Sequence, residues 1–420
     1  MTIIMHKLRA SLLLSFLCLF IFVGSVFAAQ NCEDKYDCKS DKDDYEQCLN
    51  KKVSCLEDNL NETKEKKTTL ENAISIINGS INIQQVKISQ TKNEITQLEK
   101  EITELDNRIS GLTISLDRLS TLLVERIRTQ YKREQVSPLS FVASSRSLAN
   151  FVSQFRYLRL AGQQTASAMQ KADSQKAIYD SQKDLKEIKQ QEIESKRYEL
   201  QSEQNTLVGQ RQEQQNLLSV TKNDEQKFQQ LLKEAQEQIA SIRRYTSSRG
   251  GSSILSGMTK CDDWGCYYNQ RDSQWGNQLI GKSNENMAEV GCLITATAMI
   301  TSHYGKTLTP AQIAASSNPF FYNTADMLWT WSGPVNGVTA TRSRVGYNSS
   351  ALDIELNAGR PAIVRISAGN SVGTHFVVVT EKKDGKYMMK DPYEVDGNDI
   401  PFTDKHSLSQ ITAVDRVNVY

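Results

Sequence analysis

The sequence has 420 residues, and its 50 Lys and Arg nearly balance its 49 Asp and Glu, giving a formal net charge of +1. A chain this close to neutral lacks the basic excess typical of proteins that bind nucleic acid, so nothing favours such a partner. Six of the seven Pro and all four Trp lie beyond residue 260, whereas the long middle region is rich in Gln, Glu, Lys, Ser and Leu. This division predicts a long helical part followed by one compact domain of about 160 residues, which is large enough to bury its own core.

The first 28 residues have the pattern of a secretory signal peptide. Lys7 and Arg9 precede an apolar run from Leu12 to Phe27, and Val26 and Ala28 suit cleavage after Ala28. An uncleaved membrane anchor is the alternative, but it needs about 20 apolar residues, and this run is shorter. We therefore expect a secreted protein or one held in the extracytoplasmic cell envelope.

Four cysteines follow in the segment 29–60, at Cys32, Cys38, Cys48 and Cys55. Behind a signal peptide they predict two disulfides, and the sequence leaves all three pairings open. A zinc site is the rival interpretation, although the closely spaced Cys-x2-4-Cys pairs of zinc modules are missing.

Isoleucine and leucine then recur every seven residues, at Ile74, Ile81, Ile88, Ile95, Ile102, Ile109, Leu116 and Leu123. A second series stands three residues after members of the first, at Ile77, Leu98, Leu105, Leu112 and Leu119. This a/d pattern, with Ile at a and mostly Leu at d, predicts a coiled coil within an all-α region that we place at residues 61–245.

The helical region has two tracts of similar length, at about 55–134 and about 161–245. Matched arms joined by a short segment predict an antiparallel hairpin. Because Ile at a and Leu at d also favour two-stranded parallel coils, a homodimer stays open. The joining segment, the helical tip at about 136–160, contains Pro138, which breaks the first helix. Its apolar residues are too dense for a two-helix seam, and they indicate either a helical cap on the hairpin or a docking site for a membrane or protein partner.

The element from Tyr131 through Ser137–Phe151 resembles the coiled-coil regions of division-associated peptidoglycan hydrolases and their activators. The resemblance covers about residues 60–240. It implies that the hairpin tip engages a membrane complex similar to an ABC transporter, and that the hairpin restrains the catalytic end.

Residues 246–260 are rich in Gly and Ser and are predicted to be a flexible linker. The domain at 261–420 opens with Cys261 and Cys266, which we expect to form a disulfide. The coarse pattern is α+β. Helices are expected near 291–304, 310–316 and 350–358, and strands at 361–367, 375–382 and 386–391, the last two joined by an Asp384-Gly385 hairpin turn.

Cys292 is the cysteine that these local groups leave unpaired. It begins a predicted buried helix, and a helix N-terminus with a nearby imidazolium lowers the pKa of a thiol. His375 precedes an apolar strand and Asp391 precedes Pro392, so the order Cys, His, Asp suggests a thiol hydrolase. Gln270 is the candidate for the side-chain amide that faces the oxyanion, and Asn286 is the alternative.

These residues resemble the cysteine peptidases related to the bacteriocin-leader-processing family, in the papain superfamily. The matching motifs cover nearly all of residues 265–395, and they are Gln270-Arg271-Asp272-x-x-Trp275, Gly291-Cys292, Thr295, Ala298-Met299, His303-Tyr304-Gly305, Gly359-Arg360-Pro361, His375 and Asp391-Pro392. The resemblance implies a papain-like fold with Cys292, His375 and Asp391 as the triad. Leu293 and Ile294 depart from the small or turn-forming residues usual after the cysteine, and Leu293 could narrow the site or mark a lost activity.

Two functions follow as hypotheses. The first is a secreted cysteine hydrolase that cleaves amide bonds, with peptidoglycan peptides the expected substrate and other peptides second. The second is a non-catalytic scaffold that activates other wall hydrolases and binds peptide or glycan through its C-terminal domain. Neither implies a cofactor or a metal. His303 and His406 are interpreted as structural or exposed.

Overall fold

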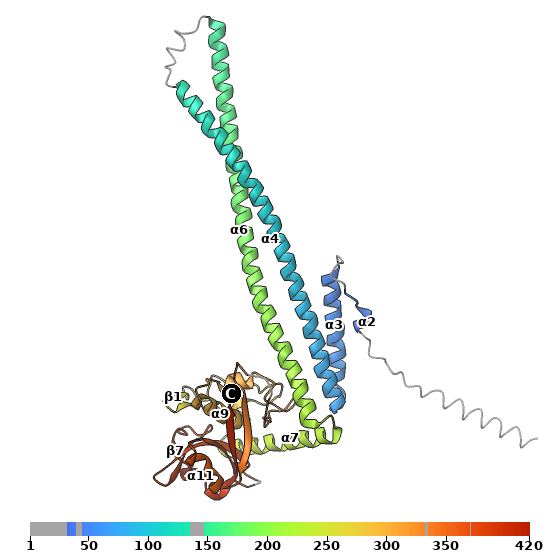
Figure 1. Ribbon diagram of the computed structural model, residues 1–420, viewed down its shortest axis with the longest axis vertical. Coiled ribbons are helices and arrows are strands. Elements are labelled where there is room, and N and C mark those ends of the chain that lie inside the picture. The colour runs from blue at the N-terminus through green and yellow to red at the C-terminus, as the bar shows by residue number, and fades with distance from the viewer. Residues whose placement is uncertain (1–31, 39–43, 135–146, 332–334, 370) are drawn as a thin grey trace, which may run out of the picture. The chain divides into compact units, whose positions relative to one another are not determined.

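The computed structural model describes residues 32–38, 44–134, 147–331, 335–369 and 371–420 (Figure 1). These residues form two compact units. One is residues 87–204, and the other combines the described residues up to 86 with 205–420. The expected signal peptide lies outside the described residues. None of the helices that the structure describes has an apolar stretch long enough to cross a bilayer.

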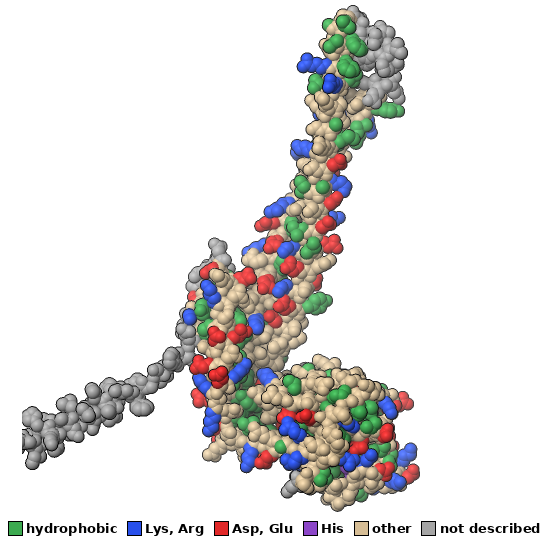
Figure 2. Space-filling view, turned by 180° about the vertical axis from the view of Figure 1, so that it is seen from behind, with side chains coloured by type: hydrophobic (Ala, Val, Ile, Leu, Met, Phe, Trp, Pro, Cys, Tyr) green, Lys and Arg blue, Asp and Glu red, His purple; other side chains and the backbone are tan. Residues whose placement is uncertain are grey.

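The unit of residues 87–204 is an antiparallel helical hairpin. Its arms belong to α4 (Leu70–Glu134) and α6 (Leu148–Thr221). Ion pairs join Glu94 to Lys196 at 2.7 Å and Asp106 to Lys186 at 2.6 Å, so residue numbers fall along one arm as they rise along the other. The d-position residues Leu98 and Leu105 are buried in the seam, as the heptad pattern predicts. Acidic and basic side chains alternate on the outer surface (Figure 2).

Part of the predicted tip lies outside the described residues, at 135–146. From Leu148 onward the chain belongs to α6, so this portion continues the arm instead of forming a separate cap. Several apolar side chains at this end of the hairpin are exposed, among them Leu148 at 81%, Val152 at 56%, Phe155 at 60% and Tyr157 at 58%.

The N-terminal cysteines pair as Cys32–Cys55 and Cys38–Cys48, which settles the choice among the three predicted pairings. The disulfides connect α2 (Cys32–Lys35) and the segment after it to α3 (Tyr45–Lys64). Leu49 and Leu56 of α3 lie in a buried cluster with Ile83 and Val86 of α4, so this segment is attached by packing as well as by covalent bonds.

The second predicted tract divides into two helices. α6 ends at Thr221, and α7 (Glu225–Ser248) begins after three intervening residues. Lys222 and Asn223 adopt positive φ values of 52° and 56°, a left-handed turn that ends α6. Asp224 then caps α7 by accepting a hydrogen bond from the Lys227 amide at 2.7 Å. A turn residue and a cap residue in succession therefore redirect the chain.

A six-stranded antiparallel sheet forms the centre of the C-terminal domain. Its order is β3 (Ala340–Gly346), β8 (Ile411–Val419), β4 (Ala362–Ser367), β5 (Thr374–Lys383), β6 (Lys386–Lys390) and β7 (Ile400–Pro401). Asp384 and Gly385 both have positive φ in the β5–β6 turn, as the sequence predicts. The sequence patterns did not indicate β3 or β8.

Helices cover both faces of this sheet. α9 (Cys292–His303) packs in a cluster with Ile363 and Val378, whereas α11 (Ser349–Asn357) packs through Leu352 in a cluster with Val364 and Val377. Since neighbouring residues of a strand point to opposite faces, these are two separate layers of core. The fold class predicted from the sequence, a long helical hairpin followed by an α+β domain, is confirmed.

Shorter elements complete the domain. They are β1 (Lys260–Asp262), β2 (Gly265–Tyr267), α8 (Met287–Val290), α10 (Pro310–Ala314) and the 3₁₀ turns at Phe402–Asp404 and Leu408–Gln410. The predicted disulfide Cys261–Cys266 joins β1 to β2. Within the segment predicted to be a linker, α7 extends to Ser248, and Leu255 exchanges backbone hydrogen bonds with Arg271 and Ser273 at 2.9 and 2.7 Å.

Candidate active site

Cys292 is the first residue of α9, and its side chain is fully buried. Among the described residues it is the one cysteine outside a disulfide. Gly291, which precedes it, must lack a side chain, because a Cβ there would lie 2.4 Å from the Met287 carbonyl oxygen. The close approach of α8 to α9 thereby fixes the sulfur at the positive end of a twelve-residue helix, where negative charge is stabilised.

His375 and Asp391 come from neighbouring strands of the sheet. His375 is the second residue of β5, and Asp391 directly follows β6. The His375 Nε2 lies 2.8 Å from Asp391 Oδ1, and both side chains are at most 1% exposed. The Cys292 thiol lies close enough to the imidazole of His375 to contribute to the pKa of that ring. The structure therefore brings together all three residues that the sequence proposed as a triad, in the order thiol, imidazole, carboxylate.

The charged forms of His375 and Asp391 stabilise each other. Burial by itself would lower the pKa of His375, but the Asp391 carboxylate, its hydrogen bond to the ring and the neighbouring Cys292 thiol outweigh burial and raise that pKa well above its usual value. Burial would likewise raise the pKa of Asp391, but His375 and then His406 hold it far below the usual range. A histidine that keeps its proton at neutral pH is the partner that a nucleophilic thiolate needs.

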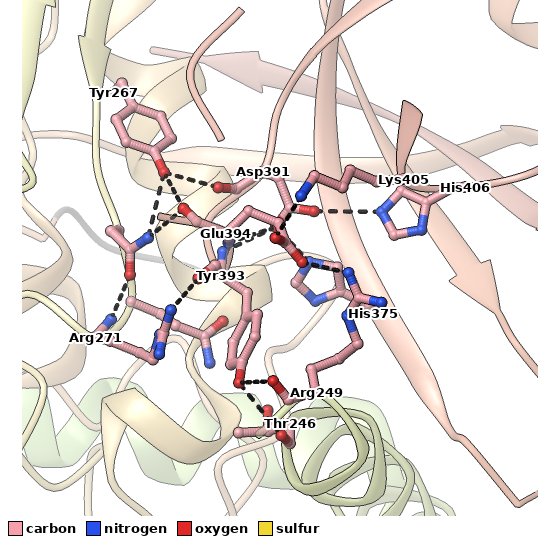
Figure 3. A network of polar contacts seen from close by, with 12 residues as sticks. Thr246, Arg249, Tyr267, Arg271, His375, Asp391, Tyr393, Glu394, Lys405 and His406 are labelled. Atoms are coloured by element: carbon pink, nitrogen blue, oxygen red, sulfur yellow. Dashed lines mark hydrogen bonds and ion pairs between the residues drawn. The ribbon is translucent and has the colours of Figure 1, made fainter. Parts of the chain in front are cut away.

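His406 is a member of the cluster that the sequence analysis missed. Its side chain is buried, and its Nε2 lies 3.3 Å from Asp391 Oδ2, the carboxylate oxygen that His375 does not use (Figure 3). The interpretation of His406 as structural or exposed came from the polar residues around it. Only the fold of the segment after β7, which packs the His406 ring against Phe402, brings it to the carboxylate.

Gln270 lies beside the short helix that leads to Cys292. It is fully buried, and its Nε2 donates to the Ala288 carbonyl at 2.8 Å. Its Oε1 is buried and has no hydrogen-bond partner among the described residues. The alternative, Asn286, is the N-cap of α8, where its side-chain oxygen accepts from the Glu289 amide at 3.0 Å. An oxyanion accepts only from the side-chain NH2 group, and Gln270 Nε2 has two N–H bonds, of which one goes to Ala288 and the other is the candidate donor to the oxyanion.

Residues next to Gln270 also hold the turn that follows Asp391. The backbone amide of Gln270 donates to the Pro392 carbonyl at 2.7 Å, and Asn269 Nδ2 donates to the Glu394 carbonyl at 2.8 Å. Arg271 donates to the Tyr393 carbonyl at 2.9 Å and lies over the Tyr393 ring (Figure 3). These contacts fix the turn that begins at Asp391, so residues from both ends of the domain orient its carboxylate.

Leu293 and Ile294, the departures from the family pattern, are buried in the core cluster that contains Cys292. Among the described residues there is no group of three or more His, Cys, Asp or Glu side chains that could hold a metal ion. A pocket of about 410 Å³ opens beside the Asp391 turn, lined by charged side chains that include Arg249, Arg271, Glu394 and Lys405.

The surface of this cluster is covered by α7. The ring of Tyr245 stacks on the imidazole of His375, with centroids 4.3 Å apart and planes inclined by 4°. Tyr245 is itself buried, at 3% exposed. No sequence pattern indicated this contact, because Tyr245 stands at the end of a helical tract whose apolar residues were interpreted as a coiled-coil seam.

Comparison with known proteins identifies the domain more closely. Residues 266–409 match the model of the "Peptidase_C39 like family". No curated protein matches the chain. No solved structure matches it either. The match supports a cysteine-peptidase-type hydrolase domain, and it includes Gln270, Cys292, His375 and Asp391, whose catalytic roles it does not test.

Proposed function

We propose that this protein is a secreted cysteine hydrolase that cleaves amide bonds with Cys292 as nucleophile. The observation that carries the proposal is the buried His375–Asp391 pair beside the buried, unpaired thiol of Cys292 at the start of α9. The match of residues 266–409 to a cysteine-peptidase family supports the same chemistry independently.

In the proposed mechanism the Cys292 thiolate attacks the carbonyl carbon of the scissile amide, forming a C–S bond and a tetrahedral oxyanion. The amide N–H groups at the start of α9 and the Gln270 side chain stabilise that oxyanion. His375 then donates its proton to the leaving nitrogen as the C–N bond breaks, leaving a thioester. Water deprotonated by His375 attacks the thioester, and the carboxylic acid product departs from the regenerated thiol.

Asp391 has two roles in this reaction. It accepts the Nε2 proton of His375, so the opposite ring nitrogen is the one that faces sulfur. It also stabilises the imidazolium that exists before attack on the amide. Tyr393 and Glu394 donate their backbone amides to Asp391 Oδ1 at 2.9 and 3.4 Å, which keeps the carboxylate in place.

The substrate we propose is the peptide part of peptidoglycan. Three disulfides are typical of proteins outside the reducing cytoplasm, and the helical hairpin resembles those of division-associated wall hydrolases. On this proposal the hairpin positions or regulates the hydrolase at the envelope. Its apolar end, with Leu148, Val152 and Phe155 exposed, is the expected contact for a membrane complex or a second copy of the chain.

The test is digestion of purified peptidoglycan, with products identified by mass spectrometry. New amino and carboxyl ends that appear with the wild-type chain and are absent with Cys292→Ala would support the proposal. Equal products from both proteins, or none from either under conditions in which Cys292 reacts freely with alkylating reagents, would reject it.

The second candidate is a scaffold that activates other wall hydrolases. The covered site favours it, because Tyr245 stacks directly on His375 and no substrate carbonyl can approach Cys292 in that arrangement. In the same digestion, stimulation of a separate wall hydrolase by both wild type and Cys292→Ala would favour the scaffold.

A further inference from the structure

Three arginines gather on the face of the sheet that packs with α9. Arg342 and Arg344 lie in β3, and Arg365 lies in β4. Asp415 of β8 lies opposite Arg344 on one side and opposite Ile363 of β4 on the other. Because alternate residues of a strand share a face, all three arginines point to the side of the sheet on which Ile363 packs in a cluster with α9.

The carboxylate in this cluster does not bind all three arginines. Asp415 is fully buried, and its two oxygens are taken by Arg342, at 2.8 Å, and by Arg344. The Nε of Arg365 is buried and has no hydrogen-bond partner among the described residues. Burial and the neighbouring charge of Arg344 lower the pKa of Arg365 against the opposing effect of Asp415. Arg365 is therefore a cation in a setting that disfavours its charge.

A second acid in the cluster, Asp326, does not remove this imbalance. It accepts a hydrogen bond from Gln238 of α7, and burial raises its pKa to about 6 although Arg342 opposes the shift. Three guanidinium groups therefore face two carboxylates at most. Partly buried charge without a partner is costly, and an anionic ligand would supply the missing counter-charge.

The ring of Trp329 holds two of the guanidinium groups in position. Its centroid lies 4.0 Å from Arg342 Cζ and 4.9 Å from Arg344 Cζ. Trp329 is 46% exposed and the Arg344 side chain is 24% exposed, so the cluster reaches solvent at this point. A guanidinium stacked on an aromatic ring still presents an N–H edge, and such an edge matches the two oxygens of a carboxylate.

The cluster lies on the same surface as the candidate active site. One face of α7 contacts both, because Gln238 bonds Asp326 and, seven residues later, Tyr245 stacks on His375. Seven residues of helix rise about 10 Å. An extended peptide advances about 3.3 Å per residue, so about three residues span this distance.

We propose that Arg344, Arg365 and Trp329 form a subsite for a free carboxylate of the substrate, about three residues from the amide that Cys292 attacks. The inference rests on the proposed function, since that function supplies the position of the scissile bond. It narrows the substrate class to acidic peptides. Peptides whose carboxylates are blocked as amides bind weakly.

The experiment is calorimetric titration of soluble muropeptides into the full-length Cys292→Ala chain, so that binding is measured without cleavage. The muropeptides are titrated as released from peptidoglycan and after conversion of their carboxylates to amides. Arg365→Gln, made in this parent chain, removes the unpartnered guanidinium, and Arg365→Lys keeps its charge. Arg360→Gln is the matched control, because it removes a guanidinium just before β4 that bonds Glu355 instead.

We expect Arg365→Gln to weaken muropeptide binding about tenfold, and amidation to weaken binding to the parent chain by a similar factor, because each removes a charge-assisted hydrogen bond. Arg365→Lys should retain part of the affinity, and Arg360→Gln should bind as the parent does. Thermal unfolding gives a second readout. Since the charge of Arg365 is disfavoured in the fold, Arg365→Gln should leave Tm unchanged or raise it.

Equal binding by the parent and Arg365→Gln chains, equal binding of untreated and amidated muropeptides, or no binding to the parent would overturn the subsite. An equal loss in Arg360→Gln would overturn it as well, since the effect would then follow net charge. Weaker binding accompanied by a lower Tm would assign Arg365 to the fold instead. Carboxylate-selective binding by a chain whose wild type cleaves no peptidoglycan would retain the subsite and reject the hydrolase.

Discussion

His406 Nε2 lies 3.3 Å from Asp391 Oδ2, on the side of the carboxylate opposite His375. The carboxylate is fully buried and has an imidazole on each oxygen. A second donor of this kind fixes the plane of the carboxylate, which in turn fixes the ring that Asp391 orients. In the proposed mechanism His406 acts through Asp391, as a positioning residue.

We expect His406→Ala to lower kcat/KM about tenfold, because the carboxylate loses one of its donors and can rotate. His406→Gln should retain more activity, since its amide can still donate to Oδ2. The acid limb of the pH–rate profile should move to higher pH in His406→Ala, because Asp391 is then more easily protonated. His303→Gln is the control, at a histidine that contacts the Trp264 carbonyl instead. Identical pH profiles for wild type and His406→Ala would show that the contact has no part in catalysis.

Asp391→Asn should abolish most activity while the domain stays folded. The amide can keep accepting from the Tyr393 backbone, but it removes the negative charge that raises the pKa of His375. The wrong tautomer of His375 then faces sulfur, and losses of about 10²–10⁴ in kcat are the usual scale for such a change. Alkylation of Cys292 at pH 6, compared in the Tyr245→Ala background, should slow in parallel. Unchanged labelling would mean that the thiol does not depend on the pair.

Gly373→Ala tests how closely α7 is seated. Gly373 and Gly369 both have left-handed backbones, with φ of 97° and 92°, but a Cβ at Gly369 would meet nothing within 4 Å. Both substitutions should share the backbone cost of about 1–2 kcal/mol. At Gly373 the Cβ would also lie 2.1 Å from the Ser241 carbonyl oxygen of α7, so only Gly373→Ala should displace α7 and speed Cys292 alkylation. Equal labelling of the two variants would contradict the close seating of α7.

Glu355→Gln should reduce stability in a pH-dependent way. Glu355 is buried and bonds Arg416 at 2.6 Å and Arg360 at 2.8 Å, and these partners lower its pKa to about 2 against the opposing effect of burial. A carboxyl whose pKa is lowered on folding stabilises the fold above its unfolded pKa of about 4.3, and that contribution disappears as the pH falls towards about 2.

At pH 7 the cost of Glu355→Gln should be about 2 kcal/mol, since both arginines are partly solvated. Chemical denaturation of wild type and variant at pH 7, 5, 4 and 3 measures it. The difference in the free energy of unfolding between wild type and variant should narrow only below about pH 5. A difference that stays constant across this pH series would assign the lost stability to packing instead of charge.

The sequence predicted the parts of this molecule that depend on periodicity and on local order. The heptads of the first arm, the helix that starts at Cys292 and the Asp384-Gly385 hairpin are examples, since neighbouring residues determine each of them. The strands β3 and β8 were not predicted, because β3 contains Arg342 and β8 contains Asp415. Charged residues suggest a solvent-exposed strand, yet these two are buried as an ion pair at 2.8 Å.

The residues of the candidate site also divide into those that local sequence order predicts and those that it does not. Cys292, His375 and Asp391 each stand at a recognisable boundary of a helix or strand, so sequence order was enough to propose them. His406 and Tyr245 reach the site only through long-range packing. The contact of Tyr245 with His375 joins residues 130 positions apart, and the helical pattern around Tyr245 satisfies a coiled-coil interpretation equally well. The disulfide pairing among Cys32, Cys38, Cys48 and Cys55 was open for another reason, because four cysteines in one short segment allow three pairings and their spacing does not rank them.

The three disulfides all close within local segments, over 23, 10 and 5 residues, and their cysteines lie outside α7. The contact between α7 and the catalytic cluster is therefore entirely non-covalent. Exposing His375 by displacing Tyr245 would require no covalent bond to be cleaved or reduced, and the displacement would be reversible.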